Sequence, residues 1–139
     1  MNAQPTTPPR VSIVIPFLNE EGTLRELKER IQSTLDQAKI SFELIFIDDG
    51  SNDGSLALAQ TLSREDARVR VFSFRHNCGK AAALQIGFEN TFGEFVFTMD
   101  ADLQDAPEEL PGLLSMLLEG NWDLVSGWKQ KRHDPISKT

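Results

Sequence analysis

The sequence predicts an α/β protein whose open, mostly parallel sheet has helices on both faces. Short apolar runs rich in Val, Ile and Phe alternate along the chain with segments of helical periodicity. Several of these runs are nearly continuous, which is typical of strands buried on both faces. The alternation gives βαβ units, and their right-handed crossovers place helices against the sheet. A chain of 139 residues is long enough to bury the core of one such domain.

The predicted elements follow one another in a regular order. Strands are expected at residues 11–17, 42–47, 69–74, 94–99 and 122–126. Helices are expected at residues 20–37, 55–64, 80–91 and 107–119. The first helix has a clear apolar face, formed by Leu24, Leu27, Ile31 and Leu35. The fourth opens with Pro107 and two glutamates, which suit a helix N-terminus.

Composition limits the partners and the compartment. The net charge of -7 disfavours nucleic acid as a partner. The single cysteine, Cys78, cannot form an intramolecular disulfide, which favours a reducing compartment. Residues 1–10 have no apolar h-region, and we expect them to be disordered. No apolar run approaches the roughly 20 residues that span a bilayer, so the chain as given is expected to be soluble.

The last residues differ from the rest in charge. Residues 128–139 carry four basic residues and one acid, whereas residues 1–127 carry 10 basic and 20 acidic residues. Trp128 lies beside this basic segment. Such a segment suits an anionic membrane surface or an acceptor phosphate, and equally a solubilising tail.

Polar loops follow four consecutive predicted strands. Because open α/β sheets bind ligands beyond the carboxyl ends of their strands, these loops are the candidate site. They lie at residues 16–21, 48–54, 75–80 and 100–105.

Two acids at the end of the fourth predicted strand are candidate metal ligands. Asp100 and Asp102 are two residues apart, so extended geometry points both the same way. Their oxygens, with Gln104, suit Mg²⁺ or Mn²⁺. The alternative is an acidic turn that precedes the helix at Pro107.

The other loops also have a structural alternative. Asp48 and Asp49 suit nucleobase N–H groups or ribose hydroxyls, or else a simple βα turn. Asn19 and the acids after it can equally cap a helix. Lys80 and the glycine before it suit a phosphate at a helix N-terminus, or else a solvated loop.

Taken together, these motifs resemble the family 2 glycosyltransferases of GT-A fold. The resemblance covers residues 11–135 and is most similar to the polyprenyl-phosphate (dolichol-phosphate-type) branch. The motifs occur in the family's order, as Val11-Ser12-Ile13-Val14-Ile15-Pro16, Asn19-Glu20-Glu21, Ile47-Asp48-Asp49-Gly50-Ser51-Asn52-Asp53-Gly54, Arg75 with Asn77, Gly79 and Lys80, and Met99-Asp100-Ala101-Asp102-Leu103-Gln104-Asp105 followed by Pro107-Glu108.

The resemblance implies roles for individual residues. Those expected to contact the nucleotide are Pro16, Asn19, Glu20, Asp48, Asp49, Asn77, Gly79, Lys80 and Asp100. Those expected to hold the metal are Asp100, Asp102 and Gln104. Asp100, Asp102 and Arg132 are the expected catalytic residues, with Arg132 in a basic acceptor loop. One departure is Leu18, where the family commonly has an aromatic side chain that stacks on the base.

The implied activity is inverting transfer of a sugar from a UDP- or GDP-linked donor to a polyprenyl phosphate. The implied layout is a nucleotide-sugar-binding GT-A domain at residues 11–127, followed by the start of an acceptor region at 128–139. Family catalytic domains continue further, so the resemblance implies a truncated domain that need not be active alone. The full-length protein is then expected at the cytoplasmic face of a membrane.

Two other functions stay open. One is a family 2 transferase that acts on a polysaccharide or another cell-envelope acceptor. The other is a non-catalytic receiver-like switch with an acidic Mg²⁺ pocket, although its acidic pair would follow the first strand rather than the second. A dinucleotide-binding oxidoreductase is excluded, because residues 16–22 lack the glycine pattern that follows its first strand.

Overall fold

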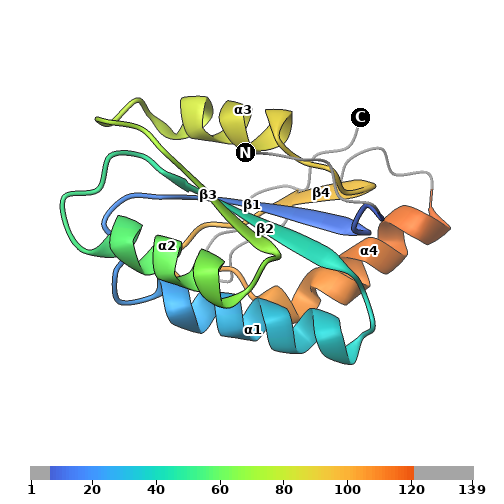
Figure 1. Ribbon diagram of the computed structural model, residues 1–139. Coiled ribbons are helices and arrows are strands. Elements are labelled where there is room, and N and C mark those ends of the chain that lie inside the picture. Colours follow the sequence, from blue (N-terminus) through green and yellow to red (C-terminus); the bar gives the residue numbers. More distant parts are fainter. Residues whose placement is uncertain (1–6, 121–139) are drawn as a thin grey trace.

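A computed structural model describes residues 7–120 and shows a four-stranded parallel sheet (Figure 1). Its strands are β1 (Val11–Phe17), β2 (Phe42–Asp48), β3 (Val69–Ser73) and β4 (Phe95–Thr98). Their order is β3-β2-β1-β4, so β1 and β2 lie in the centre. In register, Val11 lies opposite both Phe42 and Phe95. All four strands therefore deliver their carboxyl ends, and the loops after them, to one edge of the sheet.

Helices cover both faces of this sheet (Figure 1). They are α1 (Leu24–Gln37), α2 (Ser55–Glu65), α3 (Lys80–Glu89) and α4 (Leu110–Glu119). A short 3₁₀ turn, η1 (Pro107–Glu109), leads into α4. Helices α1, α2 and α4 lie against one face, and α3 lies against the other (Figure 1). The α/β architecture expected from the sequence is confirmed.

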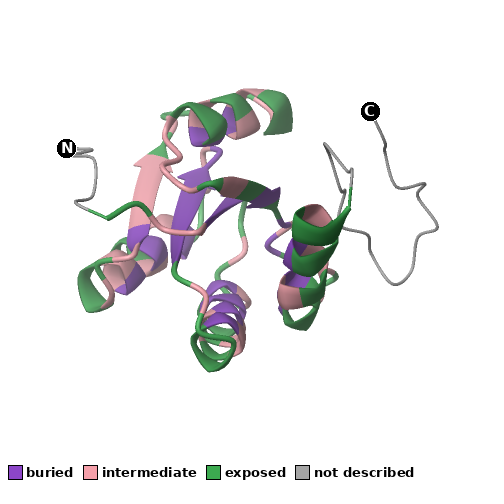
Figure 2. Cartoon of the chain, turned by 90° about the vertical axis from the view of Figure 1, so that its right-hand side faces the viewer, coloured by how far each residue is buried: buried purple, intermediate pink, exposed green. Residues whose placement is uncertain are grey.

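The core has two parts, one on each side of the sheet (Figure 2). The larger part packs side chains such as Ile13 and Ile15 against Leu27 and its neighbours on the helices of that face. The smaller part packs Val14, Ile45 and Ile47 against Ala83 under α3. Both faces of β1 and β2 are thus buried, which explains why these two runs are so continuously apolar.

Four of the predicted strands are confirmed, and the helix boundaries differ in detail. Helix α1 begins at Leu24 rather than at residue 20, because Asn19 takes a φ of 55° and residues 20–23 form a turn first. The expected helix at 107–119 begins as 3₁₀ before it becomes α-helical. The predicted strand at 122–126 and the basic segment at 128–139 lie outside the described residues.

Within residues 7–120, no helix has the length and apolar character needed to cross a membrane.

Candidate functional site: an acidic cleft at the carboxyl edge of the sheet

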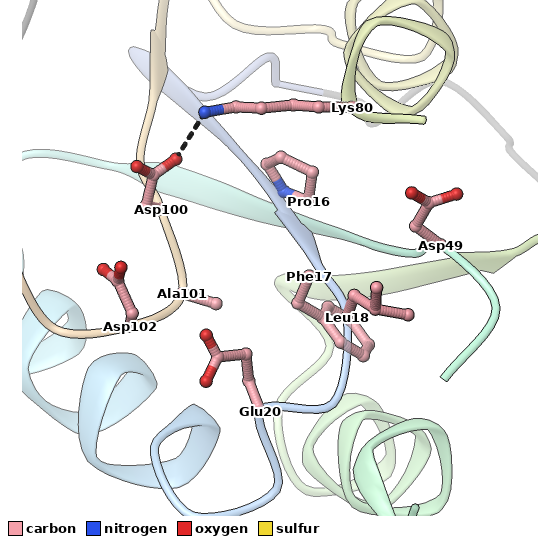
Figure 3. A pocket seen from close by; sticks show the side chains of 9 residues that line it. All are labelled: Pro16, Phe17, Leu18, Glu20, Asp49, Lys80, Asp100, Ala101 and Asp102. Atoms are coloured by element: carbon pink, nitrogen blue, oxygen red, sulfur yellow. Dashed lines mark hydrogen bonds and ion pairs between the residues drawn. The ribbon is translucent and has the colours of Figure 1, made fainter. Parts of the chain in front are cut away.

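The loops after β1, β2 and β4 enclose a cleft of about 320 Å³ (Figure 3). Helix α3 adds one side chain from its first turn. The lining residues are Pro16, Phe17, Leu18, Glu20, Asp49, Lys80, Asp100, Ala101 and Asp102. Asp49 and Asp102 come from different strands and open onto this same cleft, as the edge of a parallel sheet allows.

Reciprocal hydrogen bonds join the loops after β1 and β2. The amide of Asn19 donates to Ser51 Oγ at 2.8 Å, and the amide of Asn52 donates to Asn19 Oδ1 at 2.8 Å. The amide of Glu20 donates to Ser55 Oγ, also at 2.8 Å. The exposed Asn19 side chain therefore holds the two loops together and does not line the cleft, whereas Glu20 does.

Asp48 is buried and supports the loop that follows it. Its Oδ1 accepts the amide of Ser51 at 2.9 Å, and its Oδ2 accepts the hydroxyl of Ser73 at 3.2 Å. Asp48 is only 2% exposed and is not among the lining residues, so it supports the loop, whereas the resemblance implied a contact with the nucleotide.

Asp49 lines the cleft and also holds the loop before α3. Its Oδ1 accepts the amides of Cys78 at 2.7 Å and Gly79 at 3.2 Å. Gly50, with a φ of +86°, lets this loop come close, because a Cβ there would lie 2.6 Å from the carbonyl carbon of His76. These two amides therefore bind a carboxylate of the protein itself, whereas the sequence suggested an external phosphate at this helix start.

The loop after β4 is fixed at both ends. The amide of Asp100 donates to Asp105 Oδ2 at 2.9 Å, which closes the loop on itself. The hydroxyl of Thr23, at the start of α1, donates to the carbonyl of Ala101 at 2.6 Å. Between Asp100 and Asp105, Leu103 takes a φ of 65°, which is uncommon for a leucine. The loop thus presents Asp102 on a fixed turn.

Two side chains cross the cleft toward one another (Figure 3). Lys80, the first residue of α3, places its Nζ 2.8 Å from Asp100 Oδ1. Asp102 is exposed and accepts the amide of Gln104 at 3.1 Å. The Gln104 side chain is itself exposed and is not among the lining residues.

Negative charge accumulates around Asp102. Burial, followed by the charges of Asp102 and Asp53, raises the pKa of Glu20 above its ordinary value. Burial, followed by the charge of Asp102, raises the pKa of Asp105 to about 6. Burial is the larger cause of both shifts, and the nearby carboxylates add to it.

The donor set fits a hard divalent cation that also has ligands from outside the protein. Among residues 7–120, no group of three or more His, Cys, Asp or Glu side chains is placed to hold a metal ion alone. Asp100 and Asp102 supply carboxylate oxygens at one side of the cleft. Mg²⁺ typically binds through one or two carboxylates, with phosphates and water completing the shell. These two residues are therefore adequate for a metal that arrives with a diphosphate.

Most of the predicted site residues are brought together. Six line the cleft, namely Pro16, Glu20, Asp49, Lys80, Asp100 and Asp102. Five lie beside it without lining it, namely Asn19, Asp48, Asn77, Gly79 and Gln104. Arg132 lies outside the described residues. Roles for all of them stay predictions.

The sequence did not single out Thr23 and Asp105 as positioning residues. Thr23 immediately precedes an apolar helical face, a position typical of a helix cap, but its hydroxyl makes no cap bond and binds the carbonyl of Ala101 instead. Asp105 gave no comparable signal, because its bond to Asp100 depends on the turn at Leu103.

Comparisons with known proteins bear on the family and the fold. The profile described as "Glycosyl transferase family 2" matches residues 12–137. The undecaprenyl-phosphate 4-deoxy-4-formamido-L-arabinose transferase of Aeromonas hydrophila is 40% identical over 125 residues, which cover 89% of this chain and 38% of that protein. The dodecaprenyl-phosphate galacturonate synthase of Rhizobium johnstonii is 35% identical over 127 residues, which cover 91% and 38%.

Among solved structures, a mannosyltransferase of Pyrobaculum calidifontis in complex with GDP-Man and Mn²⁺ superposes with a TM-score of 0.68. It is 22% identical, and the match covers 86% of this chain and 35% of that one. This likeness concerns the fold. The chain spans 38% of the length of each of these two relatives. Their names therefore describe proteins much longer than the part compared.

Proposed function

Because this chain belongs to glycosyl transferase family 2, we propose that it binds a nucleoside-diphosphate sugar in the acidic cleft and supports inverting transfer of the sugar to a polyprenyl phosphate. The fold is GT-A, as the resemblance implied. Membership of this family also argues against the hypothesis of a receiver-like switch.

The observation that carries the proposal is the convergence of separate strand ends on one cleft. Glu20 follows β1, Asp49 follows β2, and Asp100 and Asp102 follow β4. A base and ribose need acceptors for N–H and O–H groups, which Asp49 offers at one side of the cleft and Glu20 offers nearer Asp102 (Figure 3). A diphosphate needs cations, which Lys80 and a metal at Asp100 and Asp102 would offer at the other side.

Each of these groups has a chemical task in the transfer. The divalent metal, when bound, would stabilise the negative charge that develops on the leaving nucleoside diphosphate. Asp100 and Asp102 would hold it, and Lys80, whose ammonium lies beside Asp100, would neutralise charge on the diphosphate from the same side of the cleft. The sugar carbon would pass through an oxocarbenium-like state, so attack from the face opposite the diphosphate inverts it. Pro16 and Leu18 would exclude water beside the nucleoside.

A lipid phosphate is the acceptor that the relatives favour. Both named relatives are described as acting with undecaprenyl or dodecaprenyl phosphate. A phosphate oxygen is already anionic near neutral pH, so its attack needs no general base. A polysaccharide hydroxyl would need one. Membrane association of the full-length protein follows from this proposal, since such an acceptor resides in a bilayer.

A thermal-shift panel tests the donor site. We expect UDP- or GDP-linked sugars with Mn²⁺ to raise the melting temperature of the protein, and Asp102→Ala to abolish most of the metal-dependent part. Asp36→Ala is the matched control, because Asp36 pairs with Arg68 away from the cleft. Unchanged melting with every common nucleotide sugar, with and without Mn²⁺, would contradict the proposal.

A further inference from the structure

Lys80 spans the cleft from α3 to the loop after β4 (Figure 3). Its ammonium lies 2.8 Å from Asp100 Oδ1, above Pro16 at the end of β1. Among the described residues that line the cleft, Lys80 is the one cation beside four carboxylates, those of Glu20, Asp49, Asp100 and Asp102. The ligand-free cleft is therefore partly neutralised by the protein itself.

The ion pair between Lys80 and Asp100 is only partly shielded from water, so it is weak. The Lys80 side chain is 62% exposed and that of Asp100 is 19% exposed. An ion pair this open to water contributes little to stability, and the lysine stem is flexible. A divalent cation carries twice the charge and prefers the same carboxylate oxygens. Lys80 and such a cation therefore compete for Asp100.

Lys80 also lies at a position from which it can serve a second partner. It is the first residue of α3, where the helix dipole favours an anionic ligand. The two preceding amides are already bound to Asp49, whereas the lysine ammonium is carried on a flexible stem that can reach a phosphate by changing rotamer. The bonds from the Cys78 and Gly79 amides to Asp49 hold the backbone just before Lys80 in place during that change.

We propose that Lys80 is an exchangeable counter-ion. In the ligand-free protein it neutralises Asp100, and when a divalent cation is bound by Asp100 and Asp102 it releases Asp100 and turns its ammonium to the donor's diphosphate. This inference rests on the proposed donor site. It means that Lys80 opposes metal binding when nucleotide is absent and favours nucleotide binding when metal is present.

Lys80→Met tests these opposite effects in the full-length protein. With Mn²⁺ alone, followed through the electron paramagnetic resonance signal of free Mn²⁺, we expect binding about threefold tighter than in the wild type, in line with loss of an exposed ion pair. With saturating Mn²⁺, we expect UDP or GDP to bind about tenfold more weakly, because a charge-assisted contact is lost. A structural defect would weaken both, so the opposite signs identify the exchange.

Arg75→Gln is the charge-matched control. It removes one positive charge from the same loop and keeps the pair between Lys80 and Asp100. We expect it to leave Mn²⁺ binding nearly unchanged. Equal tightening by Arg75→Gln, or unchanged or weaker Mn²⁺ binding by Lys80→Met, would overturn the exchange while the proposed function stands. If the wild type bound neither Mn²⁺ nor any nucleotide, both the proposed function and the exchange would be overturned.

Discussion

The two edges of the sheet carry similar kinds of charged side chains but balance them differently. At the amino edge, four acids each have a cation within 3.2 Å. The pairs are Arg10 with Glu94, Lys28 and Arg68 with Asp66, Arg68 with Asp36, and Arg70 with Glu43. At the carboxyl edge, Lys80 alone among the lining residues faces four carboxylates.

The pKa shifts follow this difference. The Arg68 guanidinium holds the pKa of Asp66 well below its ordinary value, whereas burial and nearby acids raise the pKa values of Glu20 and Asp105. The paired acids at the amino edge are thus neutralised locally. The acids that line the cleft have one lysine among them, which suits the charged ligand proposed for this site. Charge balance therefore distinguishes the cleft from the amino edge.

The largest expected effect comes from breaking the buried pair at the amino edge. Glu43 accepts Ser12 Oγ at 2.5 Å and the amide of Phe92 at 2.6 Å, and its side chain is 8% exposed. Arg70→Met leaves that carboxylate buried without its cation, so we expect the free energy of unfolding to fall by about 3–5 kcal/mol. Chemical denaturation measures this.

Adding Glu43→Gln to that variant is the control, because the amide keeps an oxygen for the same donors without the charge. We expect the double variant to recover most of the loss. A loss below about 1 kcal/mol in the single variant would mean that the amino edge does not depend on its charge balance.

A smaller change of opposite sign in the free energy of unfolding is expected when Asp105 is replaced by asparagine. Because its folded pKa is raised from 3.8 to about 6, the folded state binds more protons in this range. Its contribution to stability is therefore complete below pH 3.8 and is lost as the pH rises through about 6. Asp105→Asn should remove this decline and stabilise the ligand-free protein at pH 7 by about 1 kcal/mol, once solvent screening is allowed for.

Unfolding free energies of both proteins measured from pH 4 to pH 7 give the comparison. Asp66→Asn is the contrasting control, because the stability contributed by the lowered pKa of Asp66 is lost only below pH 3.8, so its difference from the wild type should stay constant across this range. Parallel curves for wild type and Asp105→Asn across this range would refute the raised pKa of Asp105.

The smallest effect is expected at the exposed pair between Arg10 and Glu94. Both side chains are open to water, so Glu94→Gln should change the free energy of unfolding by less than about 0.5 kcal/mol. The difference should shrink further at high ionic strength, which screens exposed charges. A loss comparable with that of Arg70→Met would show that burial does not set the value of these pairs.

Much of the fold was predictable because the central strands are buried on both faces. The largely apolar run at 42–47 predicted β2 almost to its last residue. Two features in or beside such runs were not predictable. Glu43 interrupts β2 and is neutralised by Arg70, which is distant in sequence. Asn19 takes a positive φ, which delays the start of α1. The apolar periodicity of a segment carries no information about a cation that is distant in sequence or about a positive backbone angle.

The candidate site shows the same limit. Strand ends placed Asp49, Asp100 and Asp102 at one edge, and the structure brings them to one cleft. The partners of these acids depend on loop geometry. The sequence did not indicate that Asp49 would bind the amides of Cys78 and Gly79, or that Asp105 would close the loop after β4. Residue types identified the site, and tertiary contacts determined which oxygens are engaged.

Paramagnetic broadening tests the central contrast most directly. Mn²⁺ added with UDP or GDP to isotopically labelled protein broadens the amide signals nearest to it. We predict that the signals of Glu20, Lys80 and residues 100–105 disappear first, while those of Glu43 and Arg70 at the amino edge persist. Broadening that began at the amino edge, or that was uniform over the chain, would contradict a metal and diphosphate site in the acidic cleft.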